Sequence, residues 1–379
     1  MPLASILSGD RLALARLLTQ VENDSDAGRA ALAELFPQAG KAHLVGITGA
    51  PGTGKSSLVN QLALHYRQQN KKIAIVAIDP SSPFTGGAVL GDRVRMRDLS
   101  GDAGVFIRSM AARGSLGGLA QATAGVVQVF DAAGFEIILI ETVGAGQSEV
   151  DIARLAHTTV VVEAPGMGDD IQAIKAGILE IADIIIVNKA DRPGVENTEK
   201  ALRSALELGH PGPRVFRHHG RDSSSPGLPG PARTSDTPLR GTRPPAPQND
   251  TTDGIWIPPI LRTVSTEGTG IAEVADAIER HAAHLRVSGD WAARERARLR
   301  SELEALIQSA LVTRFHADVP QENYDQVVEQ VMNRGLSPWE AVETLVNGSA
   351  GTHPHSPPSP REAPRAKRAG KGRGSRSRK

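Results

Sequence analysis

Short runs rich in apolar residues alternate with amphipathic segments through the middle of the chain. Such runs are typical of parallel strands covered on both faces, and they occupy residues 44–48, 73–79, 105–109, 137–141, 158–163 and 184–188. Segments with apolar residues at helical spacing fall between them, at 56–68, 118–133, 169–180 and 196–208. This alternation predicts an α/β fold with a doubly wound, mostly parallel sheet. Ligands of such sheets bind at the carboxyl ends of the strands.

Helical patterns flank this core on both sides. Residues 3–36 carry apolar positions at helical spacing with a break near 24–26, which predicts a helical hairpin. Beyond the core, helices are predicted at 284–316, 325–332 and 337–347. We therefore expect an N-terminal helical segment at 1–40, the sheet domain at 41–284, a C-terminal helical region at 285–350 and a tail at 351–379.

Two stretches show neither pattern. Residues 211–254 are dominated by Pro, Gly, Ser, Thr and Arg, which predicts a disordered insertion within the sheet domain. Strand-like residues resume at 256–257 and 261–264, so we expect the sheet to continue beyond the insertion. The Pro- and Arg-rich segment 351–379 is predicted to be a second disordered stretch.

Composition excludes several kinds of chemistry. The 379 residues include no cysteine, which excludes disulfides, thiolate zinc sites and cysteine nucleophiles. No apolar run approaches the roughly 20 residues that span a bilayer, and the first residues lack the pattern of a signal peptide. We expect a cytoplasmic protein without a membrane partner.

The net charge of +1 hides an asymmetry. Residues 361–379 hold nine Lys or Arg and one acid, which leaves the rest of the chain at −7. A basic tail can contact RNA, DNA or acidic surfaces. No aromatic residue interleaves for base stacking, so a solvated end is the preferred interpretation and no nucleic-acid partner is expected.

Residues 49–56, with the sequence GAPGTGKS, match the G-x-x-x-x-G-K-[ST] pattern between an expected strand and an expected helix. Glycines let the backbone aim successive N–H groups at phosphates, and the helix start adds partial positive charge. Lys55 then reaches the β- and γ-phosphates, and the Ser56 hydroxyl can ligate Mg²⁺. The sequence predicts a nucleoside triphosphate site made by Gly49, Ala50, Pro51, Gly52, Thr53, Gly54, Lys55, Ser56 and Ser57.

The preferred base is indicated by the sequence NKAD, which follows the apolar run 184–187. The Asp191 carboxylate can accept two hydrogen bonds from guanine, whereas adenine offers no such pair. The Lys189 stem can lie along the base, and Asn188 can tie neighbouring loops together. A second base-contacting loop is expected at Ser265, Thr266 and Glu267. The predicted nucleotide is GTP.

Three carboxylates accompany the phosphate-binding loop. Asp79 and Asp92 bracket a long segment with little regular pattern, which suits a loop over a ligand. Glu141 ends an apolar run and is followed closely by Gly144, where proteins with this loop place a carboxylate near Mg²⁺ and a glycine near the γ-phosphate. Either Asp79 or Glu141 alone could equally be a helix-capping carboxylate.

At these residues the chain resembles the MeaB/ArgK family of GTPases, the methylmalonyl-CoA mutase-associated proteins. The resemblance rests on GAPGTGKSS, DPSSPFTGGAVLGDRVRM, FIRSMAARGSLGGLA, ETVGAGQSE, PGMGDDIQAIKAGILEIAD and NKAD. It covers most of residues 5–210 and resumes around 255–348. The insertion, the basic tail and Ser57, where Thr is usual, depart from the family pattern.

The resemblance implies a homodimeric GTPase, paired through the region 285–350, that chaperones an adenosylcobalamin-dependent acyl-CoA mutase. Such a protein gates cobalamin delivery from an adenosyltransferase and removal of damaged cofactor. Methylmalonyl-CoA and isobutyryl-CoA mutases both remain open as clients.

The resemblance also implies site roles. Lys55, Asp92 and Glu141 would serve catalysis, and Ser56, Asp79, Asp92 and Glu141 would surround Mg²⁺ directly or through water. The segment 165–175 resembles a switch that signals nucleotide state, with Asp169, Asp170 and Lys175 as its charged members. Without the resemblance, these three residues could simply open a helix.

In-line attack of water on the γ-phosphorus is the expected chemistry, with slow turnover that a partner accelerates. No Gln directly follows Gly144, and Gln147 is the nearest candidate to orient water.

Other classes of protein share the expected core. A nickel metallochaperone would need Cys or His clusters, but the only adjacent histidines are His218 and His219, in the insertion. A signal-recognition GTPase would need a targeting domain, and five methionines argue against a Met-rich one. An ArgK-type kinase linked to basic amino-acid transport would need a second substrate pocket, which the sequence does not identify.

Overall fold

The structure is a computed structural model, and it describes residues 3–80, 96–99, 101–112, 118–142, 148–166, 178–208, 251–252 and 255–349. Two compact units make up the chain, residues 1–307 and residues 308–379. Among the described residues, no helix is both long enough and apolar enough to cross a membrane.

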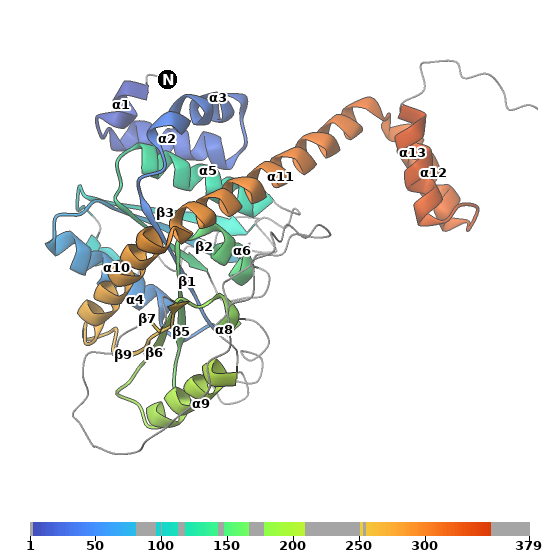
Figure 1. The fold of residues 1–379 in the computed structure, drawn as a ribbon. Helices are drawn as coiled ribbons and strands as arrows, with labels where there is room; N and C mark the ends of the chain where they lie inside the picture. Colours follow the sequence, from blue (N-terminus) through green and yellow to red (C-terminus); the bar gives the residue numbers. More distant parts are fainter. Residues whose placement is uncertain are drawn as a thin grey trace, which may run out of the picture. The chain divides into compact units, whose positions relative to one another are not determined.

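A seven-stranded parallel sheet forms the centre of the first unit (Figure 1). Its strand order is β3-β2-β4-β1-β5-β6-β9. The strands are β1 (His43–Thr48), β2 (Ile73–Pro80), β3 (Val105–Ala112), β4 (Ile137–Thr142), β5 (Thr158–Glu163), β6 (Ile184–Asn188) and β9 (Ile260–Thr263). All six neighbouring pairs are parallel, which confirms the predicted fold class. Because β9 pairs with β6, the sheet continues beyond the insertion, as expected.

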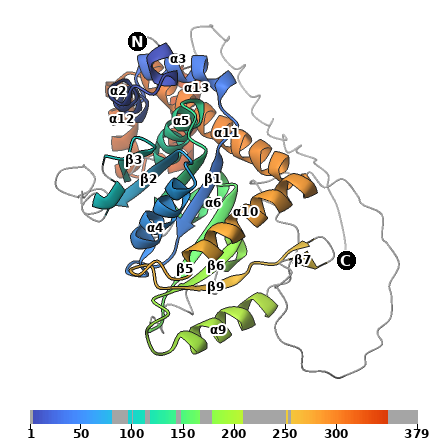
Figure 2. The same cartoon turned by 90° about the vertical axis from the view of Figure 1, so that its left-hand side faces the viewer.

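Helices cover both faces of the sheet, because each strand alternates its buried side chains between two apolar clusters. On one face, α4 (Lys55–Gln68) and α10 (Ile271–Ser288) bury Leu58, Leu62 and Ile278 against the sheet. On the other face lie α5 (Gly118–Ala132), α6 (Ser148–Leu155), α8 (Ile178–Ile181) and α9 (Val195–Leu208). Figure 2 shows α9 and α10 on opposite sides of the strands β6 and β9.

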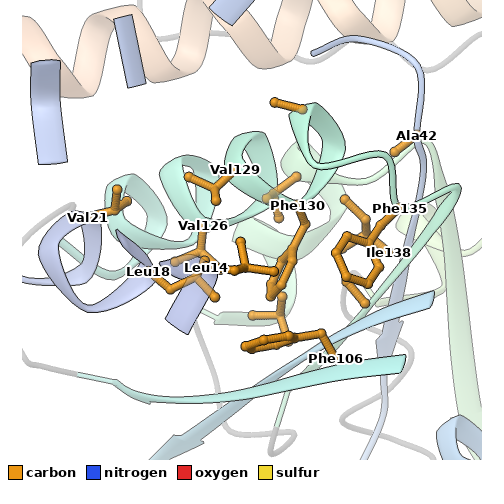
Figure 3. Packing of buried hydrophobic residues seen from close by; sticks show 14 of the residues in the cluster. Leu14, Leu18, Val21, Ala42, Phe106, Val126, Val129, Phe130, Phe135 and Ile138 are labelled. Carbon is orange, nitrogen blue, oxygen red and sulfur yellow. The ribbon is translucent and has the colours of Figure 1, made fainter. Parts of the chain in front are cut away.

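The N-terminal helices complete the second of these faces. They are α1 (Leu3–Leu7), α2 (Arg11–Glu22) and α3 (Asp26–Leu35), followed by a short 3-10 helix, η1 (Phe36–Gln38). The Ser25 hydroxyl accepts a hydrogen bond from Gly28 N and begins α3 at the predicted break. Leu14 and Leu18 of α2 pack with Phe106 and Phe130 of β3 and α5 (Figure 3).

The long helix predicted over 284–316 is wrong at its start. Gly289, with φ of 84°, separates α10 from α11 (Asp290–Asp318). Glycine adopts this left-handed conformation without a Cβ penalty and so ends α10. The prediction also missed α6, most of α10 and the strand β7 (Thr251–Thr252), which pairs antiparallel with β8 (Ile255–Trp256). The strand-like residues expected at 256–257 overlap β8. Of the helix predicted over 169–180, only its end lies within the described residues, in α8.

The described part of the second unit is helical. After the end of α11 come α12 (Gln321–Met332) and α13 (Pro338–Ser349), at positions close to the predicted short helices. Their apolar side chains are mostly exposed: Met332 and Trp339 are each 72% exposed. A further 3-10 helix, η3 (Arg97–Leu99), lies in the first unit.

Candidate functional site

The candidate site lies at the carboxyl edge of the sheet. The phosphate-binding loop leaves β1 at Thr48, the Glu141 carboxyl group lies near the end of β4, and Asn188 ends β6. These strands are parallel, so their carboxyl ends lie at the same edge. The fold therefore brings together motifs that are about 140 residues apart in the sequence.

The backbone of the phosphate-binding loop requires glycine at two positions. Gly49 has φ of 138°, and a Cβ there would come within 2.1 Å of the Val162 carbonyl oxygen of β5. Gly54 has φ of 95°, and a Cβ there would come within 2.3 Å of Asn188 Nδ2. Side chains at these positions would both strain the backbone and displace a neighbouring element. The loop is thus fitted tightly against β5 and the end of β6.

Lys55 begins α4 and folds back over this loop. Its side chain is buried, and Nζ donates hydrogen bonds to Gly49 O at 2.8 Å and Ala50 O at 2.9 Å. Thr53, also buried, donates its hydroxyl hydrogen to Ala50 O at 2.9 Å. These bonds place a positive charge inside the loop, beside the start of a helix whose dipole has the same sign. The arrangement suits a phosphate group.

Ser56 and Glu141 meet across the same edge. Ser56 Oγ donates to Glu141 Oε1 at 2.6 Å, and both side chains are buried. Hydroxyl and carboxylate oxygens are the hard ligands that Mg²⁺ prefers. The pair Ser56 and Glu141 therefore fits a magnesium ion. No cluster of three or more His, Cys, Asp or Glu that could hold a metal occurs within the described ranges.

The other two predicted magnesium carboxylates are less fully described. Asp79 lies in β2, two residues beyond Ala77, whose register partner in β4 is Glu141. Its backbone is thus at the same edge, but nothing is described of its side chain. Asp92 lies outside the described residues, as do Gly144, Gln147, His218, His219 and the predicted switch residues Asp169, Asp170 and Lys175.

Asn188 joins three segments of the site. Its side chain is buried, and Nδ2 donates to Thr53 O in the phosphate-binding loop at 2.8 Å. Its Oδ1 accepts from Thr263 Oγ1 at 3.0 Å, at the end of β9. It also accepts from Ser265 N at 3.1 Å and from Ser265 Oγ at 2.8 Å. One amide therefore fixes the phosphate loop relative to the loop that follows β9.

The side chain of Lys189 also reaches the phosphate-binding loop. The residue has φ of 57°, and its Nζ donates to Gly52 O at 2.6 Å. The aliphatic stem therefore spans from the end of β6 to the phosphate-binding loop. Asp191, Thr266 and Glu267 are exposed at this edge, whereas Ser265 is buried. Ser265 is therefore engaged in holding Asn188, and the exposed residues are the ones a base could reach.

Three threonines of the site were missed in the sequence. Thr263 bonds to Asn188, and the hydroxyl of Thr142 donates to Thr48 Oγ1 at 3.1 Å between the ends of β4 and β1. All three are buried. Each ends its strand in the structure, and a polar residue ending an apolar run was the available signal.

Comparison with known proteins agrees with this geometry. The family model described as methylmalonyl Co-A mutase-associated GTPase MeaB matches residues 14–320. A protein of Pyrococcus horikoshii that bears a GTPase name is 40% identical over 344 residues, which cover 90% of this chain and 96% of that protein. The mitochondrial methylmalonic aciduria type A homolog of Mus musculus is 28% identical over 314 residues, 82% of this chain and 66% of that protein.

A solved structure supports the fold. The crystal structure of a LAO/AO transport system kinase is similar with a TM-score of 0.58 and 23% identity, over 91% of this chain and 95% of that one. At this identity the likeness shows the fold alone.

Proposed function

The chain belongs to the MeaB family of methylmalonyl-CoA mutase-associated GTPases and is a GTP hydrolase, and we propose that it serves an adenosylcobalamin-dependent acyl-CoA mutase as a chaperone. Methylmalonyl-CoA mutase is the preferred client because the family description names it. In this role GTP hydrolysis gates the loading of cobalamin from an adenosyltransferase and protects the mutase. The observation that best supports GTP binding is the position of the Asn188 amide, which joins the phosphate-binding loop to the loop after β9.

In the proposed mechanism this chain's residues act mainly by position and charge. The loop N–H groups and Lys55 hold the β- and γ-phosphates, so that water attacks the γ-phosphorus in line. Ser56 and Glu141, with Asp79 and Asp92, would hold Mg²⁺. When bound, that ion would neutralise charge on the phosphate oxygens.

Guanine selectivity is assigned to the exposed end of the NKAD segment. Asp191 would accept two hydrogen bonds from the base, while the stem of Lys189 lies along it. The contact of Lys189 Nζ with Gly52 O supports this proposal, because it extends the side chain from the NKAD segment to the phosphate-binding loop.

The second unit supports a homodimer. Trp339, Val342 and Val346 of α13 lie at helical spacing and are 72%, 51% and 52% exposed. An exposed apolar stripe on a helix usually marks a protein interface. We propose that a second copy of the chain covers it.

The test is GTP turnover by the purified protein, alone and with methylmalonyl-CoA mutase, with ATP as the control nucleotide and Lys55→Ala as the inactive variant. Turnover that the mutase stimulates, and that is selective for GTP, is the expected result. GTP turnover that no acyl-CoA mutase changes would contradict the chaperone role and leave the GTPase standing. The kinase alternative rests on fold likeness alone and has no observation of its own.

A further inference from the structure

A cavity lies at the opposite edge of the sheet from the phosphate-binding loop. Its volume is about 600 Å³, within the usual range for small-molecule sites. It opens where β1 and β4 begin, and its lining includes Lys41, His43, Tyr66, Asp131, Glu136 and Arg286. The six residues of β1 separate the cavity from the phosphate-binding loop. At the usual rise per residue, this strand is about 20 Å long. The cavity is therefore distinct from the nucleotide site.

The acids of this cavity are already engaged by the protein. Asp131 accepts backbone hydrogen bonds from Gly40, Lys41 and Ala42, at 2.5, 3.1 and 3.0 Å. Glu136 accepts from Lys72 N at 3.0 Å. The third lining acid, Glu279, forms an ion pair with Lys71 at 2.5 Å. Each carboxylate is thus neutralised or held by donors.

Two cations of the lining have no such partner. Neither Lys41 nor Arg286 forms an ion pair with any carboxylate in the described part of the chain. The Arg286 guanidinium lies over the Trp291 ring, 4.4 Å from its centre, which fixes its position without neutralising its charge. Two unpaired cations beside satisfied acids favour an anionic ligand.

Buried residues behind His43, which is itself part of the lining, determine which of its ring nitrogens accepts a hydrogen bond. Asp183 is paired with Arg294 by two hydrogen bonds of 2.9 Å, and His281 Nε2 lies 3.3 Å from Asp183 Oδ1. The Asp183 carboxylate would repel a nitrogen lone pair at this distance, so a neutral His281 carries its proton on Nε2, and its Nδ1 accepts from Thr158 Oγ1 at 2.8 Å. Thr158 Oγ1 in turn accepts from His43 Nε2 at 2.8 Å.

This chain of bonds leaves Nδ1 of His43 as a lone-pair acceptor, and no described residue donates to it. Burial, followed by the nearby histidines and Arg286, holds the pKa of His43 well below its usual range, so the ring stays neutral. Tyr66, which also belongs to the lining, is fully buried, and its hydroxyl has no hydrogen-bond partner among the residues that the structure describes. The cavity thus offers the His43 nitrogen as an acceptor in addition to its unpaired cations.

We propose that this cavity binds a small organic anion, with a phosphate or carboxylate group held by Lys41 and Arg286. A hydroxyl group on the same ligand donates to His43 Nδ1. The bound group is identified by its chemistry alone: one anionic end and one hydrogen-bond donor, on a molecule small enough for about 600 Å³.

Calorimetric titration of the full chain, saturated with GDP and Mg²⁺, tests the proposal. Saturation matters because the phosphate-binding loop would otherwise bind the probes. The probes are 3-hydroxybutyrate and 2-hydroxyethyl phosphate, each compared with an analogue that lacks the hydroxyl, butyrate and ethyl phosphate. We expect one hydroxylated probe to bind one per chain, more tightly than its analogue, and the preferred pair shows whether carboxylate or phosphate is taken.

Substitutions in the lining test whether the probes bind in this cavity. Arg286→Gln and Lys41→Gln should each weaken it roughly tenfold or more, since each removes a charge-assisted contact. Lys200→Gln, an exposed change on α9, is the matched control and should leave affinity unchanged. No binding by any probe at millimolar concentration would overturn the proposal. So would binding that both cavity variants retain, because it would then arise elsewhere.

Discussion

Replacing Asn188 by alanine should loosen the nucleotide site as a whole. The substitution removes four hydrogen bonds, one to Thr53 O and three from Thr263 and Ser265. The side chain is only 2% exposed, so water cannot take over these contacts without rearrangement of the loops. The phosphate-binding loop and the loop after β9 would then be joined by fewer contacts.

The cost can be estimated from those bonds. Each net hydrogen bond contributes about 1 kcal/mol, and a buried group left without a partner costs about 1–3 kcal/mol. Thr53 O and Ser265 N are the backbone groups left behind, so the free energy of unfolding should fall by about 3–5 kcal/mol. That is a large part of the usual 5–15 kcal/mol of a folded domain. Affinity for GTP should fall as well, because the loop must be ordered again on binding.

Urea denaturation and GTP titration measure both effects. Asn197→Ala, an exposed substitution on α9, is the control and should be close to neutral. Ser265→Ala should cost about 1 kcal/mol alone, and less in the presence of Asn188→Ala, because the two share a bond. If Asn188→Ala costs under about 1 kcal/mol, or if the two substitutions add fully, the amide does not tie the loops together.

Three further predictions concern the site and the pH dependence of stability. Lys55→Ala should abolish most GTP binding, and unchanged affinity in a filter-binding assay would contradict its phosphate role. Asp191→Asn should reduce the preference for GTP over ATP, since an amide cannot accept both donors of guanine; an unchanged ratio of kcat/KM values would refute the guanine assignment. Burial would raise the pKa of Glu295, but hydrogen bonds from His157 and Arg298 outweigh it and lower the pKa from 4.5 to about 2. The stability that Glu295 contributes is therefore present above pH 4.5 and lost as the pH falls toward 2, and Glu295→Gln should flatten urea midpoints over that interval.

The sheet could be predicted because its strands are short apolar runs bounded by polar residues. Such runs can be recognised from the local sequence alone, and their alternation with helices then restricts the possible sheet topologies. The strand β9 could be placed as well, although 211–254 intervenes, because Leu261–Val264 resumes the pattern. The boundary at Gly289 was harder, since the residues on both sides of it favour helix and only the backbone angle ends α10.

At the site, the sequence motifs predicted which residues lie close together but not which hydrogen bonds connect them. The pattern around Lys55 placed the loop between a strand and a helix, as the structure has it. The bond between Asn188 and Ser265 depends on β9 lying beside β6, a pairing that no local pattern specifies. For the same reason Thr263 was missed.

The charged residues at the start of α11 show that a charged sequence does not always form a solvent-exposed helix face. A run rich in Arg and Glu normally indicates a solvated helix face, and the helix predicted over 284–316 contains such a run. In the structure, Arg294 donates to the buried Asp183 and to His157 O, and Trp291 stacks on His157 at 4.0 Å. Removing Arg294 would take away two charge-assisted hydrogen bonds of the buried Asp183, which costs more than the pair itself contributes. The charged residues at the start of α11 thus bind the amino edge of the sheet, and only the fold reveals this because Asp183 is more than 100 residues away from Arg294.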